Sequence, residues 1–106
     1  MRRLREIQLR HAQYYESLLR ALKGKYTQGG DLAIQALELI EVELPNIKHG
    51  YEWASARMGE FEKATLLCMR FPDAGAYLLK LRLHPEEWLA WQQDGLEAAR
   101  YLVIVR

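Results

Sequence analysis

The chain is poor in residues that cross-link or interrupt a fold, with one cysteine, three prolines and seven glycines among 106 residues. A single cysteine excludes an internal disulfide and any zinc site built from paired cysteines. No apolar run reaches the roughly 18 residues of a membrane-spanning helix. The first residues, Met-Arg-Arg-Leu-Arg-Glu, lack the apolar centre of a secretory signal. We therefore expect a cytoplasmic protein with no membrane partner.

An excess of charge of one sign is also lacking, because 15 basic and 14 acidic side chains leave a net charge of +1. This balance argues against nucleic acid as a partner. The charges are unevenly placed, since residues 1–25 hold seven basic and two acidic side chains, whereas residues 26–47 hold four acidic and no basic ones. They form either solvated faces that attract each other across a hairpin or a basic docking surface. The members of that surface are Arg2, Arg3, Arg5 and Arg10.

No known catalytic motif is visible. The sequence has no phosphate-binding P-loop, no Gly-x-Ser-x-Gly elbow and no His-Glu-x-x-His pair. The three histidines fall on different predicted elements, and no nucleophile stands beside a base in a recognisable pattern. We therefore expect a protein that is not an enzyme, with no cofactor and no metal.

Four isolated residues allow two interpretations each. His11 lies on an apolar helical stripe, which favours a hydrogen-bonded core histidine over a ligand. Cys68 lies on an apolar face in the second half of its helix, which favours burial over a reactive thiolate. Glu38 and Glu41 stand three residues apart, as two metal ligands on one helix would. No Glu-x-x-His accompanies them, so a solvated helix face is favoured.

Apolar residues recur every three or four positions along the chain, a spacing that predicts helices and no sheet. The first helix is expected over residues 3–23, with Gly24 as its C-cap and a loop over residues 24–31. Tyr14 and Tyr15 point about 100° apart, so we expect one to pack and the other to reach an edge. The apolar stripe expected to be buried consists of Leu4, Ile7, His11, Tyr14, Leu18 and Leu22.

The second helix is expected to begin after an N-cap at Asp31 and to end near Gly59. Its apolar stripe keeps its phase across Pro45, although a proline inside a helix costs about 3 kcal/mol. Either one long helix is kinked near Pro45, or a second helix begins with Pro45 at its first position. The unbroken phase favours the single kinked helix.

Prolines and acidic residues suggest where the remaining helices begin and end. We expect a helix from Glu60 that is stopped by Pro72, then a helix capped by Asp73, then a last helix from Pro85. His84 is expected to be a cap or exposed. Trp88 and Trp91 share one face of the last helix, either packed in the core or exposed as interface anchors. In the helix after Asp73, the residues expected on the buried side are Tyr77, Leu78 and Leu81, with Leu79 as a further candidate.

The expected fold is therefore all-α, with five or six helices in antiparallel hairpins and a single domain over residues 1–106. Within residues 51–64, Gly59, Phe61 and Ala64 follow one another at the spacing found in the middle of a tetratricopeptide repeat, which this stretch resembles. There the glycine allows a sharp turn and the small residue a close approach of two helices.

A wider resemblance covers about residues 8–102. The segments Arg-His-Ala-Gln-Tyr-Tyr (10–15), Glu-Val-Glu-Leu-Pro-Asn-Ile (41–47) and Leu-Arg-Leu-His-Pro-Glu-Glu-Trp (81–88) are similar to a helical region of bacterial STAND-type signalling ATPases. That region follows the ATPase and winged-helix modules. The resemblance implies a tetratricopeptide-like, right-handed superhelix that senses a ligand or partner. The ATPase module lies outside the resemblance, so no nucleotide function is carried over.

We therefore expect a non-enzymatic interaction or scaffold module that binds a protein or peptide, as a sensor or regulatory segment of a signalling protein. In this repeat register the helix over residues 46–58 presents a binding face formed by Asn46, His49, Trp53 and Arg57. Arg57 and His49 would hold a carboxylate, and Trp53 would take an apolar anchor.

Two alternatives stay open. One is a homodimer that buries the last helix and residues 102–105. The other is an accessory domain of a transcription regulator, with the basic first helix near DNA.

Overall fold

The computed structural model describes the backbone of residues 2–105 and the side chains of residues 3–103. Within that range it contains helices and no strand, so the prediction of an all-α fold of five or six helices is confirmed. None of these helices is both long and apolar enough to span a bilayer. The elements are α1 (Arg2–Gln28), α2 (Gly30–Ala56), α3 (Glu62–Ala74), α4 (Leu78–Arg82) and α5 (Pro85–Val105).

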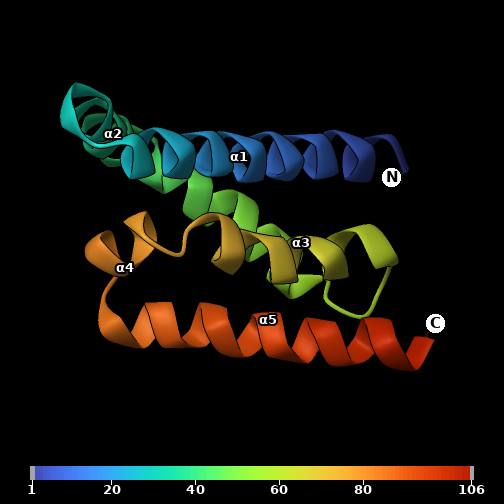
Figure 1. Ribbon diagram of the computed structural model, residues 1–106. Helices are drawn as coiled ribbons and strands as arrows, with labels where there is room; N and C mark the ends of the chain where they lie inside the picture. Colours follow the sequence, from blue (N-terminus) through green and yellow to red (C-terminus); the bar gives the residue numbers. More distant parts are fainter. Residues whose placement is uncertain (1, 106) are drawn as a thin grey trace.

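α1 and α2 form an antiparallel hairpin joined at a single residue, Gly29 (Figure 1). Gly29 and Gly30 have φ angles of 75° and 57°, in the left-handed region that favours glycine. The predicted loop over residues 24–31 is therefore wrong. Because these two glycines reverse the chain by themselves, Gly24 stays inside α1, and Gly29 rather than Asp31 is the N-cap of α2.

α2 is continuous through Pro45, in agreement with the single-helix interpretation. Ile40 and Ile47, on either side of the proline, are both fully buried. Full burial of each side chain contributes about 1.5–3 kcal/mol. Together they offset the roughly 3 kcal/mol that an interior proline costs.

Pro72 does not end its helix, contrary to the prediction. α3 begins at Glu62, two residues later than expected, and continues to Ala74 with Pro72 in its last turn. Phe71 and Ala74 are both fully buried, so packing keeps this turn helical. Asp73 consequently lies in α3 and does not cap α4.

The short helix α4 has Tyr77 at its N-cap position. Leu78 is fully buried as predicted, and so is Leu79, whereas Tyr77 and Leu81 are exposed. A helix of only five residues turns one narrow side inward, and Leu78 and Leu79 occupy that side. The predicted burial of Tyr77 and Leu81 is therefore wrong.

α5 begins at Pro85 as predicted, and the exposed His84 caps it. The backbone N–H of Glu86 donates to Nδ1 of His84 at 3.2 Å, and the backbone N–H of His84 donates to Oε1 of Glu87 at 3.3 Å. Local signals therefore determine this helix start.

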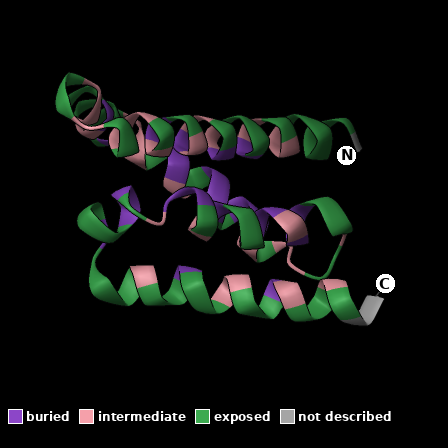
Figure 2. Cartoon of the chain, viewed as in Figure 1, coloured by how far each residue is buried: buried purple, intermediate pink, exposed green. Residues whose placement is uncertain are grey.

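α1, α3 and α5 are stacked as layers in Figure 1, with α2 crossing behind. α3 packs against both α1 and α5, so Phe71 of α3 is fully buried near the centre of the core. Gly95 allows α5 to approach closely, because a Cβ there would lie 3.3 Å from Pro72. Figure 2 shows buried positions where the layers meet and a largely exposed outer side on α1 and α5. These two helices are the outer layers of the molecule.

Candidate functional site

Three of the four predicted partner-binding residues lie along one side of the second half of α2, and the fourth, Arg57, is its C-cap residue. Asn46 and His49 are exposed, Arg57 is half-buried, and Trp53 is only 8% exposed. The indole Nε1–H of Trp53 donates to Oε1 of Gln8 in α1 at 2.9 Å. The Arg57 guanidinium lies 4.9 Å from the centre of the Trp53 ring and donates to the Trp53 carbonyl at 3.1 Å. The Trp53 ring is therefore mostly packed against its neighbours. Of the four predicted residues, Asn46 and His49 are the ones that a partner can reach.

α1 supplies the other side of this site, which the sequence did not indicate. A shallow pocket of about 210 Å³ opens between the two helices and is lined by Ile7, Gln8, His11, His49 and Trp53. The rings of His11 and His49 stand 5.5 Å apart, edge to face. His11 is half-buried at the pocket wall, so the prediction of a core histidine is wrong. Its ring lies 4.8 Å from that of Tyr15 instead.

Much of the apolar stripe of α1 is exposed. Leu4, Ile7 and Tyr14 are all more than half exposed, whereas Leu22 is fully buried. α1 is an outer helix packed on α2 and α3, so its neighbours cover only part of a broad stripe. Tyr15 is half-buried beside the exposed Tyr14, and the predicted division between these two rings is confirmed.

Basic side chains border the exposed part of α1. Arg3 and Arg10 are exposed, and their spacing places them on the side of the helix that carries Ile7 and Tyr14. Arg5 points elsewhere, with its guanidinium 4.4 Å from the centre of the Phe61 ring. The side chain of Arg2 lies outside the described residues. Two of the four predicted basic residues therefore lie beside the site.

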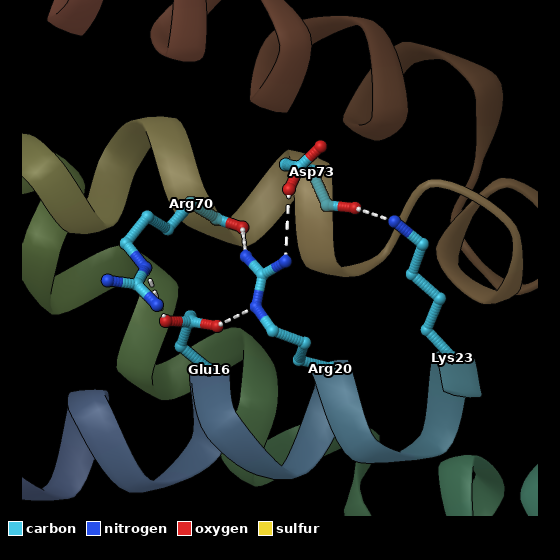
Figure 3. Close-up of polar contacts among 5 residues, drawn as sticks. All are labelled: Glu16, Arg20, Lys23, Arg70 and Asp73. Carbon is cyan, nitrogen blue, oxygen red and sulfur yellow. Dashed lines mark hydrogen bonds and ion pairs between the residues drawn. The ribbon is translucent and has the colours of Figure 1, made fainter. Parts of the chain in front are cut away.

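A second polar cluster joins α1 to α3 (Figure 3). Glu16 is 3% exposed, and its two carboxylate oxygens accept from Nε of Arg70 at 2.8 Å and Nε of Arg20 at 3.0 Å. Arg20 also pairs with Asp73 at 3.1 Å, and Lys23 donates to the Asp73 carbonyl at 3.1 Å. Every charge of this cluster has a partner, so the cluster acts as a clamp between helices. Only the Glu16–Arg20 spacing was visible in the sequence.

A third polar cluster lies between α2 and α5. The Tyr51 hydroxyl donates to the Asp94 carboxylate, which also accepts from the Ser55 hydroxyl at 2.9 Å. Burial, together with Asp94, raises the pKa of Tyr51 above its ordinary value. The Tyr51 ring stacks on Trp91 with 3.7 Å between ring centres. Trp91 is thus a core residue, whereas Trp88 is only partly buried.

Cys68 is fully buried, as predicted, and burial raises the pKa of its thiol to about 12. Glu41 pairs with Arg82 of α4 at 2.7 Å, and Glu38 is exposed. No group of three or more His, Cys, Asp or Glu residues gathers into a metal-binding arrangement within the described part of the chain.

A larger, open depression of about 560 Å³ lies between the N-terminal parts of α1 and α3. Its charged lining is mixed in sign, with Arg5 and Lys63 beside two glutamates. Arg5 already lies over Phe61 there. The depression therefore lacks a set of side chains that converge on one kind of ligand.

No protein-family model, no curated protein and no solved structure matches this chain.

Proposed function

We propose that this chain is a non-enzymatic protein-interaction module of tetratricopeptide-like type, a sensor or regulatory segment of a signalling protein. It binds an acidic amphipathic helix of its partner in the groove between α1 and α2. The observation that carries the proposal is the exposed apolar strip of Ile7 and Tyr14 bordered by Arg3 and Arg10.

The groove has the features that a helix-binding site needs. Exposed apolar side chains on one helix face provide area to bury, and the pocket beside Ile7 can receive one projecting side chain. Asn46 and His49 lie on the opposite rim and can hydrogen-bond to polar groups of a ligand. Exposed apolar surface bordered by polar groups is typical of protein-binding sites.

The charges around the groove favour an acidic partner. Arg3 and Arg10 are exposed on α1, and Arg57 is half-buried at the end of α2. Guanidinium groups bind carboxylates through two parallel hydrogen bonds, which adds geometric selectivity to attraction. We therefore expect glutamates and aspartates on the polar face of the bound helix.

A labelled peptide tests this proposal. The probe is an amphipathic helix of about 18 residues, long enough to be helical when bound, with leucines on one face and glutamates on the other. We expect I7S and R10E each to weaken binding by at least about tenfold, which corresponds to about 1.4 kcal/mol.

Two controls separate recognition from general charge effects. K80E changes the same charge at an exposed position on α4 and should leave the affinity unchanged. A peptide with lysines in place of the glutamates should not bind. Equal affinities for the parent chain, I7S and R10E would reject the groove as the binding site.

A further inference from the structure

The outer side of α5 carries a regular stripe of exposed apolar residues. Leu89, Leu96 and Val103 are 54%, 66% and 78% exposed. With Gln92 and Ala99 between them, the stripe has alternating spacings of three and four residues. This is the spacing of the a and d positions of a coiled coil, at which two helices interlock their side chains.

The stripe borders a shallow groove between α5 and α3. This groove encloses about 450 Å³, and its apolar lining includes Met69, Pro72 and Trp88. Trp88 is partly buried here, which leaves part of its ring for a neighbour. A helix laid on the stripe would therefore also contact α3, and the apolar surface is wider than α5 alone.

We propose that a second copy of this chain covers this surface, with the two α5 helices antiparallel. Glu86, Gln93 and Arg100 border the stripe on its solvent side and are seven residues apart. When two helices run antiparallel about a two-fold axis between Gln93 and Asp94, Glu86 lies beside the partner's Arg100. The symmetry repeats this pair, so one interface contains two ion pairs.

The same register also matches the apolar positions. Leu89 lies opposite the partner's Ala99, so a large side chain meets a small one. Leu96 lies opposite the partner's Gln92, whose carboxamide can reach solvent from the edge of the stripe. Layers that alternate large and small side chains fit closely, as facing helices require.

The charges select the antiparallel direction and a second copy. In a parallel pair, the side of α5 that carries Glu86 and Arg100 would face the partner's opposite side, at Trp88 and Gly95, so neither charge would meet one of opposite sign. Glu86 and Arg100 form no ion pair within residues 3–103. Opposite charges at the two ends of one stripe make it complementary to itself, which is the property of a two-fold interface.

Sedimentation of the full chain over a concentration series tests this proposal. We expect a monomer–dimer equilibrium. R100E places glutamates opposite each other at both ends and should raise the dimer dissociation constant by at least about tenfold. The double variant E86R/R100E restores both pairs with reversed sign and should return this constant to within about threefold of the parent value.

L96Q removes apolar area at a position that is exposed in the monomer, so it should abolish the dimer while the helical circular dichroism stays unchanged. L4Q makes the same change at an exposed leucine of α1, so it is the matched control and should leave the dimer intact. A chain that stays monomeric at all concentrations would overturn the proposal. So would a dimer that resists R100E and L96Q, or one that the double variant fails to restore. These outcomes are independent of peptide binding in the α1–α2 groove.

Discussion

Glu16 of α1 is joined to α3 by an ion pair with Arg70. Its buried carboxylate accepts from both Arg20 and Arg70. The isosteric change E16Q keeps the shape but removes the charge, and we expect it to lower the free energy of unfolding by about 1–3 kcal/mol. Urea unfolding measures this loss.

E6Q provides the matched control, because Glu6 is an exposed carboxylate on the same helix. Its effect on the unfolding free energy should stay within about 0.5 kcal/mol. Equal effects of E16Q and E6Q would mean that the clamp between α1 and α3 does not stabilise the fold.

Tyr51 and Cys68 should make the protein sensitive to alkali. Both pKa values are raised in the folded state, so the folded chain keeps protons that the unfolded chain loses. Stability must then fall as the pH rises above the ordinary pKa values of the two groups, which are about 8.5–10. Urea midpoints between about pH 8 and about pH 11 should decrease.

Y51F separates the contribution of the phenol. It removes the hydrogen bond to Asp94 and should cost about 0.5–1.5 kcal/mol at neutral pH. It should also make the alkaline decrease shallower, since a phenylalanine cannot ionise. If the urea midpoint fell equally steeply with pH in the parent chain and in Y51F, the role assigned to Tyr51 would be contradicted.

Among the helices, substitutions at two glycines test where α1 ends. Gly24 lies inside the helix with open space around its Cβ position. We expect G24A to stabilise the protein by about 0.5–1 kcal/mol. G29A should destabilise it by about 1–2 kcal/mol, because φ at Gly29 is 75°. Thermal unfolding compares the two, and a destabilising G24A would favour the predicted loop over the observed helix.

The helical character of the chain and the start of α5 could be predicted from the sequence, because both depend on local signals. Apolar spacing gave the helices, and the proline and two glutamates after His84 marked the start of α5. Other predicted boundaries were wrong, and two of them show why. The burial of Phe71 overrides the stop signal of Pro72, and the turn at Gly29 overrides that of Gly24.

The candidate site could be predicted only on one side. Periodicity placed His49 and Trp53 on one face of α2, but it could not show that α1 lies across from them with Ile7 and His11. Periodicity finds an apolar stripe and does not show which part of it a neighbouring helix covers. For the same reason the sequence could not show that Glu16 pairs with Arg70, because Arg70 lies on a helix that is far away in the sequence.

At the scale of the whole molecule, the two proposed surfaces belong to opposite outer layers. The groove lies on the α1–α2 hairpin and the stripe lies on α5, with α3 between α1 and α5 (Figure 1). Pairing through α5 would leave both grooves of a dimer open. A partner with two acidic helices would then bind more tightly than one with a single helix, through an increase in effective concentration.

Backbone amide NMR of the full chain during titration with the glutamate-rich peptide tests whether the groove between α1 and α2 recognises an acidic helix. We predict saturable shifts along residues 4–14 and 46–57, with the amides of residues 89–103 unchanged. Shifts that gather on α5 instead, or no shifts at all, would contradict this recognition.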